Sequence, residues 1–318
     1  MTTSVDSGFD WSVGHTGRIL QSPPILALSP HLFTTRDVSF RGPGAEEEEA
    51  RLAASFGLGA ADVSWVTQVH GRAVCVVQPG VDIPATEADA IVSTDPARAI
   101  AVRVADCVPI LIADRKRRVV AAVHAGWRGT CAGAALAAVE TIDALGIPAG
   151  DLVAALGPSI GPCCYDVDDR VRGAFLDPGA SPPAPLHAHS FGASPPLSAG
   201  SPPRGLGAVG WFRVARTLHA RSHTVKPDAA AWFTESGDGR WTLDLRRANV
   251  DQLVAAGVPA DAIHVARLCT KDNPDTCFSY RRDGPGTGRL VAAIRLGPAS
   301  AEARSGGWGR SPQIRIRT

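Results

Sequence analysis

Short apolar runs rich in valine and isoleucine recur between Val63 and His124, and turn residues separate them. Runs of this length and composition are typical of buried β-strands. The pattern therefore predicts strands near residues 63–69, 73–78, 99–104, 108–113 and 118–123. Similar runs predict three further strands, at residues 151–156, 263–268 and 290–296.

The spacing of apolar residues becomes helical after His124, which predicts a helix over residues 130–145 that Gly146 and Pro148 end. Two more helices are predicted, at residues 51–56 and 250–257. Strands and helices are mixed without a regular βαβ rhythm. This mixture favours an α+β fold over a doubly wound sheet.

The chain divides into four stretches of different character. Residues 1–30 are predicted to be irregular, residues 31–300 to form a single catalytic domain, and residues 301–318 to be a loose tail. Within the domain, residues 178–210 combine many prolines with serine, alanine and glycine and keep no periodic apolar face. We interpret this stretch as a flexible surface insertion.

The net charge of the chain limits which partners are expected, and its cysteine content indicates the cellular compartment. The 318 residues carry 32 Lys and Arg against 31 Asp and Glu, so the net charge of +1 gives no reason to expect nucleic acid or an anionic membrane. No apolar run approaches the roughly 20 residues of a membrane span, and the start lacks a secretory pattern. Seven scattered cysteines suit a reducing compartment. We expect a cytoplasmic monomer or homodimer.

Three residues that can bind metal stand where an apolar run meets a turn: His70, Cys107 and His124. Their wide separation excludes a zinc finger, so the ends of separate strands would have to assemble such a site. Two imidazoles and one thiolate suit zinc, and three protein ligands leave one coordination position open. Taken singly, each residue could instead be an ordinary buried cysteine or a hydrogen-bonded histidine.

Polar neighbours of these residues add candidate chemistry. Asp106 could orient a ligand histidine, and Arg128 could hold an anion. The pair Arg281–Arg282 could hold phosphate bidentately or be an ordinary surface charge pair. Adjacent Cys163 and Cys164 could indicate redox chemistry or metal binding, but a structural loop beside the site is favoured, because neighbouring cysteines rarely form a relaxed disulfide.

Several motifs occur in a fixed order: Thr67-Gln-Val-His-Gly71, Ala105-Asp-Cys107, His124-Ala-Gly-Trp-Arg-Gly129, Gly157-Pro-Ser-Ile-Gly-Pro-Cys-Cys-Tyr165, Leu243-Asp-Leu245, Cys269-Thr270 and Phe278-Ser-Tyr-Arg-Arg-Asp-Gly-Pro-Gly-Thr-Gly-Arg289. Together they resemble the polyphenol oxidase, or laccase-domain, family, whose members are now assigned as purine nucleoside phosphorylases with adenosine deaminase activity. The resemblance runs from about Leu32 to Leu296. It implies an α+β fold of mixed sheets surrounded by helices, similar to the catalytic domain of cytotoxic necrotizing factor toxins.

The resemblance also implies substrates and residue roles. The substrates would be phosphate with adenosine, inosine or methylthioadenosine, and the zinc ligands would be His70, Cys107 and His124. The catalytic set would be Cys107, His124, Asp106 and Arg36, the early arginine of Phe33-Thr-Thr-Arg36. Substrate and phosphate would be bound by Arg128, Arg282 and Ser159. The chain departs from the family in lacking the glycine-rich segment after Arg36, in carrying Asp166 where glutamate is usual, and in its proline-rich insertion.

Three alternatives follow from the same residues. A multicopper oxidase needs many His-x-His pairs, whereas this chain has nine histidines and one such pair, His187 and His189. Zinc is therefore preferred, with copper as the alternative metal. A metal-free hydrolase or deamidase would use Cys107 as nucleophile and a histidine as base. A zinc-stabilised binding module would unfold on chelation and consume no nucleoside.

Overall fold

The computed structural model describes residues 8–81, 85–177 and 227–298 of the chain. The proline-rich stretch predicted at 178–210 and the tail predicted at 301–318 lie outside these residues. Among the described residues, none of the helices has both the length and the apolar character needed to cross a bilayer.

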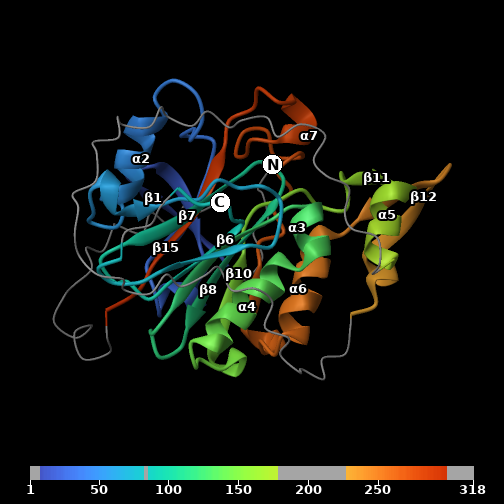
Figure 1. Ribbon diagram of the computed structural model, residues 1–318. Coiled ribbons are helices and arrows are strands. Elements are labelled where there is room, and N and C mark those ends of the chain that lie inside the picture. Colours follow the sequence, from blue (N-terminus) through green and yellow to red (C-terminus); the bar gives the residue numbers. More distant parts are fainter. Residues whose placement is uncertain (1–7, 82–84, 178–226, 299–318) are drawn as a thin grey trace, which may run out of the picture.

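Two six-stranded mixed sheets form the centre of the protein (Figure 1). The first sheet has the strand order β1 (Asp10–Gly14), β2 (Gly17–Gln21), β3 (His31–Thr34), β15 (Leu290–Arg295), β7 (Ala99–Val104) and β4 (Val63–Ser64). The second has the order β14 (Ile263–Val265), β10 (Leu152–Leu156), β8 (Val108–Asp114), β9 (Val120–Ala125), β6 (Ala90–Ser93) and β5 (Val74–Val77). A small third sheet has the order β11 (Asp166–Asp168), β13 (Arg240–Leu243) and β12 (Phe233–Gly237).

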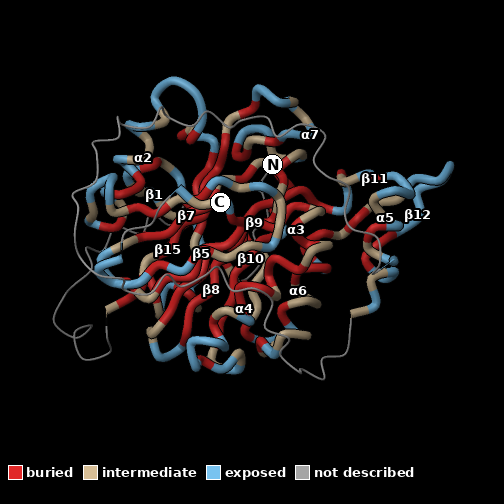
Figure 2. Tube along the Cα trace, in the orientation of Figure 1, coloured by how far each residue is buried: buried red, intermediate tan, exposed pale blue. Residues whose placement is uncertain are grey.

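The two large sheets pack face to face, and their central strands are buried on both sides (Figure 2). Leu111 of β8 packs between the sheets against residues such as Ile100 of β7, whereas Ile110 and Ile112 point to the opposite face. Alternate side chains of a strand point to opposite faces, so a strand buried on both sides must be apolar throughout. This burial explains why the sequence showed continuous apolar runs.

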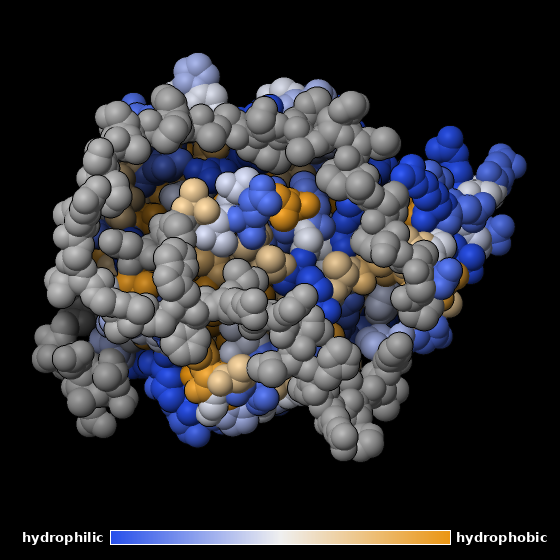
Figure 3. Space-filling view, in the orientation of Figure 1, coloured by the Kyte–Doolittle hydropathy of each residue, from blue (hydrophilic) through white to orange (hydrophobic). Residues whose placement is uncertain are grey.

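Helices cover the outer faces of both sheets. On the second sheet lie α4 (Ala134–Ala144), α6 (Leu245–Ala255) and the short α3 (Trp127–Ala132), and on the first lies α2 (Ala45–Ala54). Helix α5 (Asp169–Leu176) packs beside the small sheet, at one end of the molecule in Figure 1. That end carries mainly hydrophilic side chains in Figure 3. The remaining helices are single turns: α1 (Pro23–Leu26), α7 (Tyr280–Asp283), η1 (Ala60–Asp62), η2 (Ala149–Asp151), η3 (Ala229–Trp232) and η4 (Ala260–Ala262).

The predicted α+β class is confirmed, whereas the likeness to the toxin domain stays a prediction. The irregular start is wrong for residues 10–26, which form the β1–β2 hairpin and α1. The sequence signal there was weak because β1 is an edge strand whose side chains remain largely exposed. The helix predicted over 130–145 is two helices, since Gly133 adopts φ +82° and breaks it. The strand expected over residues 63–69 is shorter than predicted, because only Val63 and Ser64 form β4.

Candidate functional site

One edge of the second sheet gathers the residues that the sequence singled out. Strand β8 runs antiparallel to both β9 and β10, with Pro109 opposite His124 and Ile110 opposite Leu156. The start of β8 therefore lies beside the ends of β9 and β10, and β14 ends there as well because it is parallel to β10. Cys107, His124 and the loops that follow β10 and β14 consequently meet at this edge.

His70, Cys107 and His124 form the first cluster at the edge. One ligand atom from each lies within 4.8 Å of the others, and the two imidazole rings meet edge to face with centroids 4.8 Å apart. The Cys107 thiol is hydrogen-bonded to both rings. These donors are the nitrogen and sulfur ligands that zinc and related ions prefer, so the residues present fit a metal ion.

Asp89, which the sequence analysis missed, orients this cluster from its buried position before β6. Its carboxylate lies 2.8 Å from Nδ1 of His124, which leaves the other ring nitrogen to face Cys107. The same carboxylate accepts hydrogen bonds from the backbone N–H groups of His70 and Gly71, at 2.9 and 2.5 Å. A carboxylate behind a ligand histidine fixes its tautomer and ring orientation. A single aspartate ahead of an apolar run gives no sequence signal for this role.

The backbone around the cluster is unusual for non-glycine residues. His70 has φ +60° and Asp106, next to Cys107, has φ +84°. Such conformations cost of order 1–3 kcal/mol each and are concentrated at functional sites. Gly126 completes the wall, because a Cβ there would lie 2.9 Å from Sγ of Cys107 and 3.1 Å from Cδ2 of His70.

The close contacts within this cluster shift the pKa values of Cys107 and His124. Burial raises the pKa of Cys107, but the contacts with His124 and His70 have the larger combined effect. The pKa of the Cys107 thiol is therefore below its usual value. For His124, burial lowers the pKa, and Cys107 together with Asp89 raises it above its usual value. The metal-free cluster thus favours a thiolate beside an imidazolium.

Asp106 does not orient a ligand histidine, contrary to expectation, because its carboxylate points to another loop. Its carboxylate accepts hydrogen bonds from Oγ1 of Thr270, Oγ of Ser279 and the backbone N–H of Arg281, at 2.5, 3.1 and 2.6 Å. It therefore fastens the loop between β14 and α7 to the strand end that carries Cys107. The carboxylate that orients His124 is Asp89 instead.

A cavity of about 490 Å³ lies beside α3, which begins three residues after His124. Its lining includes the aromatic residues Trp127 and Tyr165, the cations Arg240 and Arg281, and the aspartates at positions 166, 168 and 238. Arg281 lies over the Tyr165 ring at 5.0 Å and donates to the Asp166 carbonyl. The volume of the cavity is within the range of small-molecule sites.

The other predicted residues are distributed around this region. Arg128 stacks on Trp127, a lining residue of the cavity, with its guanidinium 4.3 Å from the ring centroid. Arg36 lies over the Phe278 ring and donates to the Pro274 carbonyl. Ser159 is buried, and its hydroxyl accepts a hydrogen bond from Arg246.

Arg282 is fully engaged within the protein. Its guanidinium donates to the carbonyls of Thr270, Lys271 and Cys277 and makes a bidentate pair with Asp283. Five donors meet five acceptors, so the geometry argues for a structural role and against phosphate binding. Its neighbour Arg281 faces the cavity, a distinction that adjacency in the sequence concealed.

Comparison with known proteins places these features in context. A family model described as multi-copper polyphenol oxidoreductase laccase matches residues 44–191 and 209–297. A purine nucleoside phosphorylase of Streptomyces coelicolor is 42% identical over 256 residues, covering 80% of this chain and 84% of that protein. Purine nucleoside phosphorylase YlmD of Geobacillus stearothermophilus is 34% identical over 193 residues, or 60% of this chain and 53% of that protein. The crystal structure of YlmD from that species has a TM-score of 0.65 at 27% identity, covering 88% of this chain and 96% of that chain.

Proposed function

Since the chain belongs to the multi-copper polyphenol oxidoreductase laccase family, whose relatives carry the name purine nucleoside phosphorylase, we propose that it cleaves purine nucleosides with phosphate. Adenosine, inosine and methylthioadenosine would yield a free base and the corresponding ribose 1-phosphate. Adenosine deamination would be a second activity of the same site. The observation that carries the proposal is the metal-binding trio together with a cavity that is linked to it through two residues. Trp127 lines the cavity and follows His124 by three residues, and Arg281 lines the cavity and donates its backbone N–H to Asp106, next to Cys107.

Four residues of the cavity lining suit a nucleoside and phosphate: Trp127, Tyr165, Arg240 and Arg281. The lining also contains Asp166, Asp168 and Asp238, so phosphate would have to bind at the arginines and away from these carboxylates. Arg128 covers one face of Trp127 and Arg281 covers one face of Tyr165, so a purine would stack on the opposite face of either ring. Arg281, which lines the cavity, and Arg128, which stacks on Trp127, would supply planar donors for phosphate oxygens, which guanidinium groups bind bidentately. Held there, phosphate would attack C1′ of the ribose while the bond to the purine breaks.

His70, Cys107 and His124 would hold the metal ion, which we propose to be zinc. When bound, zinc would supply a Lewis acid with one open coordination position. The chain's nine histidines do not suffice for the four coppers of a laccase, so the family description does not extend to that chemistry here. Asp89 would keep His124 aligned, and Asp106 would keep the cavity loop against Cys107.

The direct test incubates the purified protein with adenosine, with and without phosphate, and separates the products by chromatography. We expect adenine and ribose 1-phosphate only when phosphate is present, and inosine from deamination in either case. Adenosine recovered unchanged from metal-loaded protein under both conditions would refute the proposed function.

Replacing Arg281 and Arg282 by alanine, one at a time, tests which of the two binds phosphate. We expect Arg281→Ala to raise the KM for phosphate by about tenfold to a hundredfold, because a charge-assisted contact of roughly 1.5–3 kcal/mol is lost. Arg282→Ala should instead lower the melting temperature, because it leaves the buried carbonyls without donors. Steady-state kinetics and thermal unfolding measure both effects. The reverse outcome, phosphate affinity lost in Arg282→Ala at unchanged stability, would assign phosphate binding to Arg282.

A further inference from the structure

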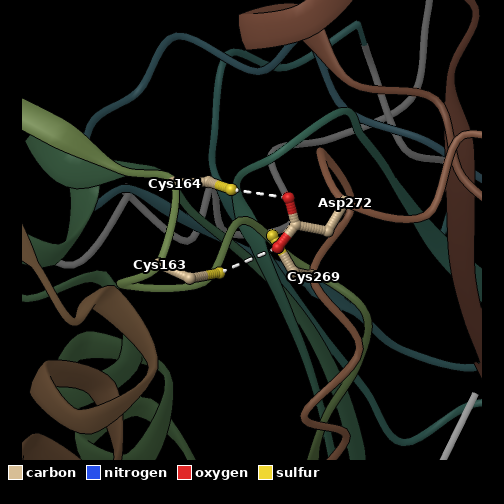
Figure 4. A group of neighbouring side chains, drawn as sticks. All are labelled: Cys163, Cys164, Cys269 and Asp272. Atoms are coloured by element: carbon tan, nitrogen blue, oxygen red, sulfur yellow. Dashed lines mark hydrogen bonds between the residues drawn. The ribbon is translucent and has the colours of Figure 1, made fainter.

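A second cluster of metal-binding side chains lies at the same sheet edge: Cys163, Cys164, Cys269 and Asp272 (Figure 4). One ligand atom from each lies within 4.8 Å of all the others. We propose that these four residues form a second zinc site, structural in role and separate from His70, Cys107 and His124. The proposal goes beyond nucleoside cleavage and does not depend on it.

The fold brings the four residues together from two loops. Cys163 and Cys164 follow β10, and Cys269 and Asp272 follow β14. Because β10 and β14 are parallel neighbours, the loops after them leave the sheet side by side. A bridge between Ser159 and Cys269 continues the pairing beyond the strands. The position of the cluster is therefore fixed by the sheet.

The side chains converge on one point, as Figure 4 shows. The Cys164 thiol donates to Oδ1 of Asp272 at 2.9 Å, and the Cys163 thiol donates to Oδ2 at 3.2 Å. In tetrahedral zinc sites with Zn–S bonds of about 2.3 Å, neighbouring sulfurs lie roughly 3.8 Å apart. Small side-chain movements would bring this cluster to that geometry, with the three thiol protons released on binding.

Gly161 allows the two loops to approach this closely. A Cβ at this position would lie 3.1 Å from Sγ of Cys163, 3.3 Å from Nη2 of Arg246 and 3.4 Å from Cβ of Cys269. The Gly161 N–H also donates to Sγ of Cys269 at 3.3 Å, an N–H···S bond that would persist to a metal-bound thiolate. Such contacts orient ligand sulfurs and stabilise their charge.

The surrounding charge suits an anionic metal complex. Three thiolates and a carboxylate around Zn²⁺ carry a net charge of about −2. Arg246 is buried behind the cluster, where its guanidinium donates to the carbonyls of Ser159 and Leu268, at 2.6 and 3.2 Å. Its positive charge would offset part of the negative charge of the complex.

Burial supports a closed site with an entry path. Cys164 and Cys269 are buried, whereas Cys163 and Asp272 are exposed, so an ion can enter from the solvent side. Four protein ligands leave no position for substrate, which is typical of a structural zinc site. A metal here would tie the loop that carries Tyr165 to the loop whose Thr270 holds Asp106. It would thus stabilise the wall of the cavity beside α3.

The test measures zinc content by mass spectrometry in the full-length protein after removal of loosely bound metal. We expect about two zinc ions per chain in the wild type and about one in both Cys163→Ser/Cys164→Ser and Asp272→Asn. Cys131→Ser is the matched control, since that thiol lies on α3 and donates to the Ala174 carbonyl. It should retain both ions.

A second measurement begins with a variant in which the four proposed ligands are intact, and it does not depend on activity. Cys107→Ser disrupts the first site and leaves the second intact, and Co²⁺ titrated into it should give the strong thiolate-to-cobalt absorption of a three-thiolate tetrahedral site. Adding Asp272→Asn should weaken that absorption, and the double substitution of Cys163 and Cys164 should abolish it. A folded Cys107→Ser protein with free thiols and neither zinc nor a cobalt spectrum would overturn the proposal. A Cys163–Cys269 disulfide in the protein as purified, found by alkylation and peptide mapping, would also overturn it.

Discussion

Replacement of Cys107 by alanine is expected to lower phosphorolysis of adenosine and inosine by roughly a thousandfold, or about 4 kcal/mol of transition-state stabilisation. The substitution removes the only sulfur ligand from the first cluster and leaves two imidazoles for an open site. It also removes the group that both His70 and His124 contact. Activity measured together with zinc content should show that turnover and the zinc ion of the first cluster are both lost.

The control for this prediction is Cys131→Ala. Cys131 is a partly buried thiol on α3, and its replacement removes the same sulfur atom away from the cluster. Its turnover and first-site zinc should match those of the wild type. Wild-type turnover in Cys107→Ala itself would refute the assignment of this cluster as the active site.

Loss of activity in Cys107→Ala also fits a metal-free hydrolase with Cys107 as nucleophile, so chelation must separate the two. If zinc is required, a strong chelator abolishes turnover and added zinc restores it, while Cys107 remains unmodified. A nucleophilic thiolate would keep its activity in the chelator and lose it to iodoacetamide. The first result is expected.

The clustering of His70, Cys107 and His124 could be predicted because each has a local signature in the sequence. His70, Cys107 and His124 each stand where an apolar run meets a turn, and strand ends are where sheets bring distant residues together. The apolar runs themselves were readable because the central strands of the two large sheets are buried on both sides. The hairpin over residues 10–21 escaped notice because an exposed edge strand has no such run.

Residues whose role depends on tertiary contact could not be predicted from local patterns. Arg281 and Arg282 are adjacent, and only the single turn of α7 decides which faces the cavity and which is held by carbonyls. Asp106 and Asp89 present the same difficulty. The aspartate next to Cys107 in sequence points to another loop, whereas the one that orients His124 lies 35 residues before it.

Asp89→Asn is expected to weaken zinc binding at the first cluster by about tenfold to a hundredfold, the usual cost of losing a carboxylate behind a ligand histidine. Oδ1 accepts from the backbone N–H of His70 and lies against Nδ1 of His124, while Oδ2 accepts from the N–H of Gly71. An amide has one oxygen and one NH₂ group, so in either orientation it points hydrogens at groups that themselves donate. Stability should therefore fall by about 1–3 kcal/mol as well.

The control for Asp89→Asn must separate damage to the ligand set from ordinary loss of a buried carboxylate. Asp114 is equally buried, pairs with Arg118, and lies at the opposite end of β8 from Cys107. Asp114→Asn should thus lower the melting temperature and leave zinc affinity unchanged, whereas Asp89→Asn should lower both. Competition with a chromophoric chelator measures the affinity, and thermal unfolding of the metal-free proteins measures the stability. Equal zinc affinity in the two variants would mean that Asp89 holds the backbone only, and that Cys107 and His70 suffice to align His124.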